Sequence, residues 1–138
     1  AVGKRIAALT ASSLKKLSLE LGGKNPTLVF ADSDWRAQQD TLVRSAFQNS
    51  GQICLCGSRL LIERAIYADF RDAFVDRVRA LRVGDPMAEG TQLGPVVSQV
   101  HFDKVMACLQ RARDEGGTVL CGGERIDRPG WFIAPTVI

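Results

Sequence analysis

The pattern of hydrophobic and polar positions along this chain changes period several times, and each change predicts a structural element. Apolar residues within positions 4–13 are compatible with a short helix, and leucines then alternate with polar residues over 17–21, which predicts a strand. The continuous apolar run at 27–31 is typical of a buried strand in an α/β sheet, and another strand is expected at 59–63. Two more short strands are expected at 118–121 and 131–133.

Helical spacing of apolar residues fills most of the remaining chain. It predicts helices over 35–48, after N-cap candidates at 32–34, and over 67–81. A further helix over 102–112 would end at the glycine pair 116–117, and 83–94 is expected to be a loop. Because strands alternate with helices, the sequence predicts the α/β class, with an open, largely parallel sheet and flanking helices.

Composition and charge narrow the class of protein. A chain of 138 residues with 46% hydrophobic and 24% charged residues suits one ordinary globular core. The net charge of +3 comes from scattered basic residues, and aromatic residues make up only 7%, so we expect no nucleic-acid partner. No apolar run reaches the roughly 18 residues of a membrane span, and no leader-like pattern opens the chain, so we expect no membrane partner. The chain starts without Met and stops inside an expected strand, and we therefore expect a piece of a longer protein.

The four cysteines indicate a reducing compartment. Cys54, Cys56, Cys108 and Cys121 are too sparse for a disulfide-held scaffold. One histidine and a Cys-x-Cys spacing fit zinc poorly, so no metal is expected. The sequence thus predicts free thiols and a cytoplasmic location.

Candidate chemistry lies in two short motifs. Cys54 ends the stretch 47–54 (FQNSGQIC), in a glycine-containing loop just past a predicted helix. Glu20 lies 34 positions upstream (54 − 20), in the stretch 19–26 (LELGGKNP), on the strand face opposite the leucines. An ordinary thiol has a pKa of about 8.5 and is mostly protonated at neutral pH, so a nearby base favours attack by the sulfur. A thiol and a carboxylate on separate elements form a minimal nucleophile–base pair.

The stretches 19–26 and 47–58 resemble the two active-site signatures of the NAD(P)-dependent aldehyde dehydrogenases, in the same order and at the family's spacing. The resemblance extends to 81–86 (LRVGDP), 93–95 (LGP) and 130–137. The stretch 52–56 (QICLC) resembles the muconic-semialdehyde dehydrogenase branch.

This resemblance implies a reaction and a set of roles. Cys54 would attack a small-molecule aldehyde to give a thiohemiacetal, hydride would pass to NAD or NADP, and water would hydrolyse the resulting thioester to a carboxylic acid. Glu20 would be the general base, the N–H of Cys54 would donate to the oxyanion, and Leu21 and Gly22 would contact the cofactor. The family commonly forms oligomers, so we expect a homo-oligomer.

The resemblance also implies how the chain divides between two domains and which segments of the family it lacks. Residues 1–21 would be the tail end of the cofactor-binding domain and residues 22–138 a partial catalytic domain. The family's Gly-Ser-Thr turn and its oxyanion asparagine would lie before residue 1, and its Glu-x-Phe-Gly-Pro segment after residue 138. We therefore expect this chain alone to bind no cofactor and to be nearly inactive.

Several alternatives stay open at the level of sequence. The chain could serve as a non-catalytic oligomerisation or interaction segment, or as a cofactor-independent thiol esterase. Cys56 could be a resolving thiol for Cys54 or a small packing residue. His101 could pair with Cys54, or be a surface or capping residue at a helix start. The Gly22-Gly23-Lys24 run lacks the spacing of a phosphate-binding loop.

Overall fold

A strand–helix–strand unit lies at the centre of the computed structural model, which describes residues 2–138. Strand β1 (Pro26–Val29) pairs in parallel with β2 (Arg59–Ile62), with Pro26 opposite Arg59 and Val29 opposite Ile62. Parallel strands need a crossover connection. Here the crossover contains α2 (Gln39–Phe47), the 3₁₀ turn η1 (Gln48–Gly51) and the Cys54 loop. The predicted α/β class with a small open parallel sheet and flanking helices is confirmed.

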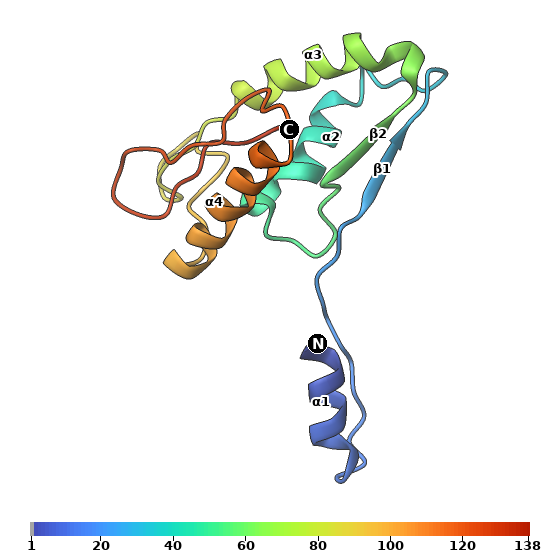
Figure 1. The fold of residues 1–138 in the computed structure, drawn as a ribbon, viewed down its shortest axis with the longest axis vertical. Coiled ribbons are helices and arrows are strands. Elements are labelled where there is room, and N and C mark those ends of the chain that lie inside the picture. Colours follow the sequence, from blue (N-terminus) through green and yellow to red (C-terminus); the bar gives the residue numbers. More distant parts are fainter. Residues whose placement is uncertain (1) are drawn as a thin grey trace.

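Two helices complete the body. After the 3₁₀ turn η2 (Arg64–Ile66), α3 (Tyr67–Arg79) packs against α2 and the sheet, and α4 (Gln99–Asp114) follows a long loop (Figure 1). All three helices predicted within the body are therefore present. Helix α2 begins four residues later than predicted, because residues 35–38 form turns in which Asp34 accepts a hydrogen bond from the Ala37 N–H.

The hydrophobic core lies between one face of the sheet and the helices α2 and α3. Phe70 is fully buried, stacks on Phe74 with ring centroids 5.7 Å apart, and meets the tilted ring of Trp35 at 5.5 Å. Aromatic pairs of this kind add to the free energy gained from burial. Val29 of β1 and Val43 of α2 close the same cluster.

The other face of the sheet is exposed. Leu28 and Leu61 lie opposite each other in the strand register, with 60% and 56% of their surfaces exposed, and Phe30 is 57% exposed. The strand predicted at 27–31 is present as β1, but the prediction that it is buried is wrong for this face. Helices cover only one face of this two-stranded sheet within residues 2–138.

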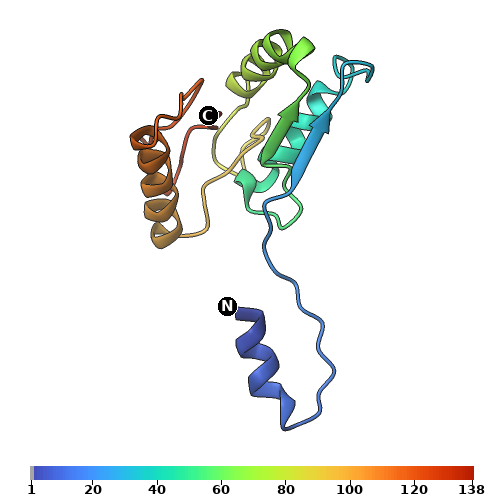
Figure 2. The ribbon, with the colours of Figure 1, turned by 45° about the vertical axis from the view of Figure 1, so that its right-hand side comes forward.

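The N-terminal helix stands away from the body. Helix α1 (Val2–Ala11) and the extended segment after it project below β1 in both views (Figures 1 and 2). Side-chain carbons of Leu19 and Leu21 lie 3.5 and 2.9 Å from the position that a Cβ on Gly3 would take, so the leucines face α1. The helix predicted at 4–13 is confirmed with shifted bounds. The strand predicted at 17–21 is wrong, because no strand within residues 2–138 lies beside it.

The C-terminal segment is held by single bridges instead of strands. Cys121 pairs with Val137, and Arg125 with Ile133, each as one isolated antiparallel bridge. The strands predicted at 118–121 and 131–133 are therefore wrong. The chain turns at residues 122 and 123, where two glycines adopt positive φ, before a ladder can extend. None of the helices within residues 2–138 is both long and apolar enough to cross a membrane.

Candidate active site

The loop that carries Cys54 begins with an uncommon backbone. Asn49, Ser50 and Gly51 have φ values of 53°, 55° and 72°, so three consecutive residues adopt the left-handed conformation. Residues other than glycine rarely adopt it, and such conformations persist where surrounding contacts impose them. One such contact is the Ser50 hydroxyl, which donates to the carbonyl of Gly94 at 2.7 Å. Cys54 lies just past the C-terminal end of α2, as predicted.

Gln52 ties the same loop to the segment before α4. Its Oε1 accepts a hydrogen bond from the Val97 N–H at 3.0 Å, and its Nε2 donates to the carbonyl of Asn49 at 3.2 Å. One side chain therefore spans the left-handed turn and the neighbouring segment. This arrangement limits the positions that the loop can take.

Asn25 ties the other side of the loop to β1. Its Nδ2 donates to the carbonyl of Cys54 at 2.7 Å and to that of Cys56 at 3.3 Å. A Cβ on Gly23 would lie 3.3 Å from the Cys54 carbonyl oxygen, so the backbones of the two motifs approach closely. Stretches about 30 positions apart in the sequence are thus in direct contact.

A shallow, open cleft of about 500 Å³ lies between these two stretches. Glu20, Leu21, Gly22 and Cys54 all line it, so the structure brings all four predicted site residues to one cleft. Cys54 and Glu20 are both exposed. Within residues 2–138, the N–H of Cys54 donates to no acceptor, which leaves it available to a bound group.

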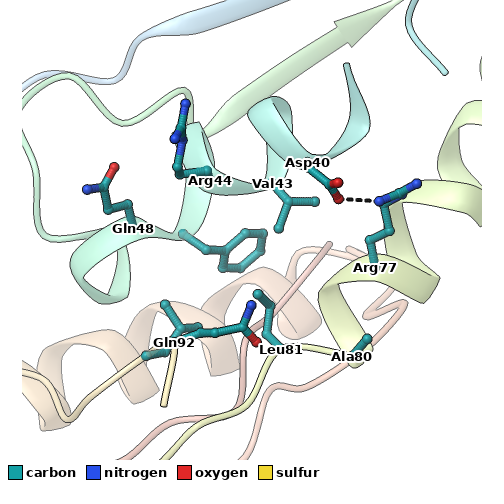
Figure 3. Close-up of a pocket in the computed structure, with 10 residues that line it drawn as sticks. Asp40, Val43, Arg44, Gln48, Arg77, Ala80, Leu81 and Gln92 are labelled. Atoms are coloured by element: carbon teal, nitrogen blue, oxygen red, sulfur yellow. Dashed lines mark hydrogen bonds and ion pairs between the residues drawn. The ribbon is translucent and has the colours of Figure 1, made fainter. Parts of the chain in front are cut away.

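A second cavity of about 500 Å³ lies between α2, the end of α3 and the loop at Gln92 (Figure 3). Val43 and Leu81 line it with apolar surface, and an ion pair between Asp40 and Arg77 closes one side (Figure 3). It is lined by no cysteine or histidine, so it offers no nucleophile of the kind found in the first cleft.

Comparison with known proteins gives the family. Residues 1–138 match the sequence profile of the aldehyde dehydrogenase family. The chain belongs to the aldehyde dehydrogenase family. It is 43% identical over 143 residues to the 2-aminomuconic semialdehyde dehydrogenase of Bos taurus, an alignment covering 98% of this chain and 29% of that protein. The chain is 41% identical over 140 residues to the chloroplastic betaine aldehyde dehydrogenase of Beta vulgaris. This alignment covers 100% of this chain and 28% of that protein.

Solved aldehyde dehydrogenase structures share the fold. HpcC from Thermus thermophilus superposes with a TM-score of 0.92 at 38% identity, covering 98% of this chain and 28% of that one. The betaine aldehyde dehydrogenase of Staphylococcus aureus, in complex with NAD⁺, superposes with a TM-score of 0.90 at 36% identity. This superposition covers 98% of this chain and 28% of that one. The chain thus spans less than a third of the length of these relatives. Relatives named for different aldehydes are almost equally identical to it, so identity alone does not select a substrate.

Two residues left open by the sequence have distinct places in this aldehyde dehydrogenase segment. Cys56 is buried, its N–H donates to the Ile53 carbonyl at 3.1 Å, and its own carbonyl accepts from the Ser58 N–H at 2.9 Å. These contacts favour a packing role over that of a resolving thiol. His101 is half-buried in the first turn of α4, whose N-cap is Ser98, and it also lines the cleft.

The sequence analysis gave no role to several residues of the site. Asn25 and Gln52 stand inside the two motifs, but spacing alone does not reveal which carbonyl or N–H each side chain meets. Val97 reaches the cleft from more than 40 positions beyond Cys54, and no local pattern marks it.

The dinucleotide implied by the family fits the described residues only in part. A Cβ on Gly22 would meet no atom within 4 Å, so the cleft is open at this residue. Pyrophosphate sites commonly use a glycine-rich turn that opens a helix directly after a strand, and no such turn borders the cleft within residues 2–138. These residues therefore do not form a complete NAD(P) site. They also contain no group of three or more metal-ligating side chains.

Proposed function

We propose that this chain carries the nucleophile and the base of an aldehyde dehydrogenase that oxidises a small-molecule aldehyde to a carboxylic acid. The observation that carries this proposal is the single cleft lined by both Cys54 and Glu20. Membership of the family over the whole chain supports it. The Staphylococcus aureus relative has been crystallised with one cysteine either free of or modified by BME, which supports a reactive thiol in that enzyme.

In the proposed reaction, the Cys54 sulfur attacks the aldehyde carbon and forms a thiohemiacetal. The carbonyl oxygen gains negative charge in this step, and the unpaired N–H of Cys54 is the donor we assign to it. Removal of one such donor commonly costs about 3 kcal/mol of transition-state stabilisation. Glu20 accepts the thiol proton through a water molecule, and later activates the water that hydrolyses the thioester.

NAD or NADP supplies the hydride acceptor in this family, with Leu21 and Gly22 as the neighbours we assign to it. Because residues 2–138 do not form a pyrophosphate site, we propose that the isolated chain does not oxidise aldehydes at enzyme rates. We also propose that residues 1–21 belong with the cofactor-binding domain and residues 22–138 with the catalytic domain. The separation of α1 from the body supports a division in this region (Figure 2). The cytoplasmic location stays a prediction from cysteine usage.

The nucleophile can be tested on the chain itself. We expect p-nitrophenyl acetate to acylate Cys54 selectively, with the adduct located by peptide mass spectrometry, because Cys54 is exposed and shares its cleft with a carboxylate that can act as a general base. We expect Glu20→Gln to slow loss of the acyl group by about a hundredfold or more, the lower end of the usual range for a general base.

The control is Cys54→Ser, which should abolish the adduct while Cys108 alkylation continues. Acylation of Cys108 at the same rate as Cys54 would contradict the proposal.

We propose self-association as a second property of this chain. The exposed apolar pair Leu28 and Leu61, together with Phe30, supports it, because monomeric proteins rarely leave adjacent large apolar side chains uncovered.

A further inference from the structure

Asn25 is the one side chain within residues 2–138 that hydrogen-bonds the backbone of Cys54. We propose that Asn25 is a positioning residue for the nucleophile, which holds the Cys54–Leu55 peptide in one orientation relative to Glu20. This inference rests on the proposed function, since it assigns a role within that reaction.

The geometry of the amide group explains how Asn25 acts. Its Nδ2 carries two hydrogens and meets two acceptors, the Cys54 carbonyl at 2.7 Å and the Cys56 carbonyl at 3.3 Å. In a planar trans peptide the C=O and the following N–H point in opposite directions. Fixing the Cys54 carbonyl therefore also fixes the Leu55 N–H, and restricts rotation of the backbone that bears the thiol.

Asn25 is itself held firmly. Its carbonyl accepts a hydrogen bond from the Arg59 N–H at 3.4 Å, and it precedes Pro26, which restricts its backbone to extended conformations. The Arg59 guanidinium donates to the Lys24 carbonyl at 2.6 Å. A Cβ on Gly23 would lie 3.1 Å from Asn25 Oδ1, so a larger residue at 23 would crowd the amide. The amide is thus attached to the paired strands, the most rigid support near the cleft.

The other hydrogen bonds of the Cys54 loop do not replace those made by Asn25. Ser50 and Gln52 hold residues on the N-terminal side of Cys54 and tie them to the segment 94–97. Asn25 instead belongs to the same segment as Glu20, five positions away. It therefore connects the nucleophile directly to the segment that carries the base, and a change at Asn25 should alter the rate of the chemical step more than binding.

The test measures acylation of Cys54 by p-nitrophenyl acetate in Asn25→Ala, with Gln38→Ala as a matched removal of an exposed amide far from the cleft. We expect Asn25→Ala to lower the maximal acylation rate about tenfold and to leave the half-saturating ester concentration within about twofold. Gln38→Ala should change neither quantity. Asn25→Asp keeps the shape of the side chain without its donors, and should give the same loss if Asn25→Ala does not fold.

Amide hydrogen exchange tests the positioning role of Asn25 without relying on acylation of Cys54. The Cys56 N–H closes the turn around Cys54, and the Ser58 N–H donates to the Cys56 carbonyl that Asn25 also contacts. Amide hydrogen exchange at these two N–H groups should be about tenfold faster in Asn25→Ala. An unchanged maximal rate, or unchanged exchange at both amides, would overturn the positioning role. If wild-type Cys54 takes no acyl group, the proposed function fails, and the exchange rates together with iodoacetamide alkylation of Cys54 still decide the role of Asn25.

Discussion

At the scale of single residues, the four cysteines occupy environments that give them different chemistry. Cys54 and Cys108 are exposed, Cys56 is buried and Cys121 is half-buried. Burial raises the pKa of the Cys121 thiol, and the opposing effects of the Val137 backbone and the Arg79 charge do not cancel it. Its Sγ donates weakly to the Pro135 carbonyl at 3.8 Å. The reactivity of each cysteine is therefore expected to depend on its environment.

We predict that Cys121 reacts with iodoacetamide at a higher pH in the folded chain than in the chain unfolded in urea. Because the folded-state pKa is raised, thiolate forms above the ordinary value of about 8.5, and the alkylation midpoint moves upward. The same shift means that its contribution to folding stability is fully present below about pH 8.5 and is lost as the pH rises through the folded pKa. Mass spectrometry of alkylated peptides across this range measures the Cys121 midpoint with and without urea. Equal midpoints in the two states would contradict the prediction.

At the scale of elements, β1 and α2 meet closely at a glycine next to the nucleophile loop. The Gly57 N–H donates to the Ser45 carbonyl at 3.1 Å. A Cβ at residue 57 would collide with the Thr27 hydroxyl oxygen and lie 2.9 Å from that of Ser45. Thr27 is β-branched and stiff, so the strand and the helix would have to separate.

We predict that Gly57→Ala lowers the free energy of unfolding by about 1–3 kcal/mol, the usual cost of overpacking. Gly22→Ala is the matched control, since a Cβ there meets no atom within 4 Å. It should change stability by no more than about 0.5–1 kcal/mol, mainly through the unfolded chain. Urea denaturation followed by circular dichroism measures both variants. Equal stability changes in the two variants would show that the close approach at residue 57 is unimportant.

The elements also show where sequence reasoning succeeds. Long periodic segments such as α3 and α4 were predictable because each buries apolar residues along one face. The extended leucine segment at 17–21 was mistaken for a strand, because alternation reports which way side chains point and not whether a partner strand exists. The pairing of Glu20 with Cys54 in one cleft was predictable from the two motifs. The Asn25 hydrogen bonds were not, since they depend on the register of β1 and β2.

At the scale of the whole molecule, the chain has two parts that leave apolar surface uncovered. The arm formed by α1 and its following segment exposes Leu9 and Leu14, and the sheet exposes Leu28 and Leu61. A ten-residue helix is marginal without packing partners. The surface that this chain presents is therefore suited to contact with further protein.

We predict that the chain self-associates in solution, and that Leu61→Lys shifts it toward the monomer by placing a charge on the exposed sheet face. Met87→Lys is the matched control, because Met87 is 91% exposed in a loop away from the sheet. Size-exclusion chromatography with light scattering gives the mass of each variant. A monomeric wild-type chain would contradict the prediction.

The place of the Cys54 loop within the crossover has a consequence for folding kinetics. Pro26 and Arg59 are paired although 33 positions separate them (59 − 26), so the chain must close a long loop before this pair forms. Asn25 can reach the Cys54 carbonyl only once that pairing exists. The walls of the cleft therefore assemble in the same step as the sheet, and the rate at which Cys54 regains its reactivity after dilution from urea should report the folding of the strand–helix–strand unit.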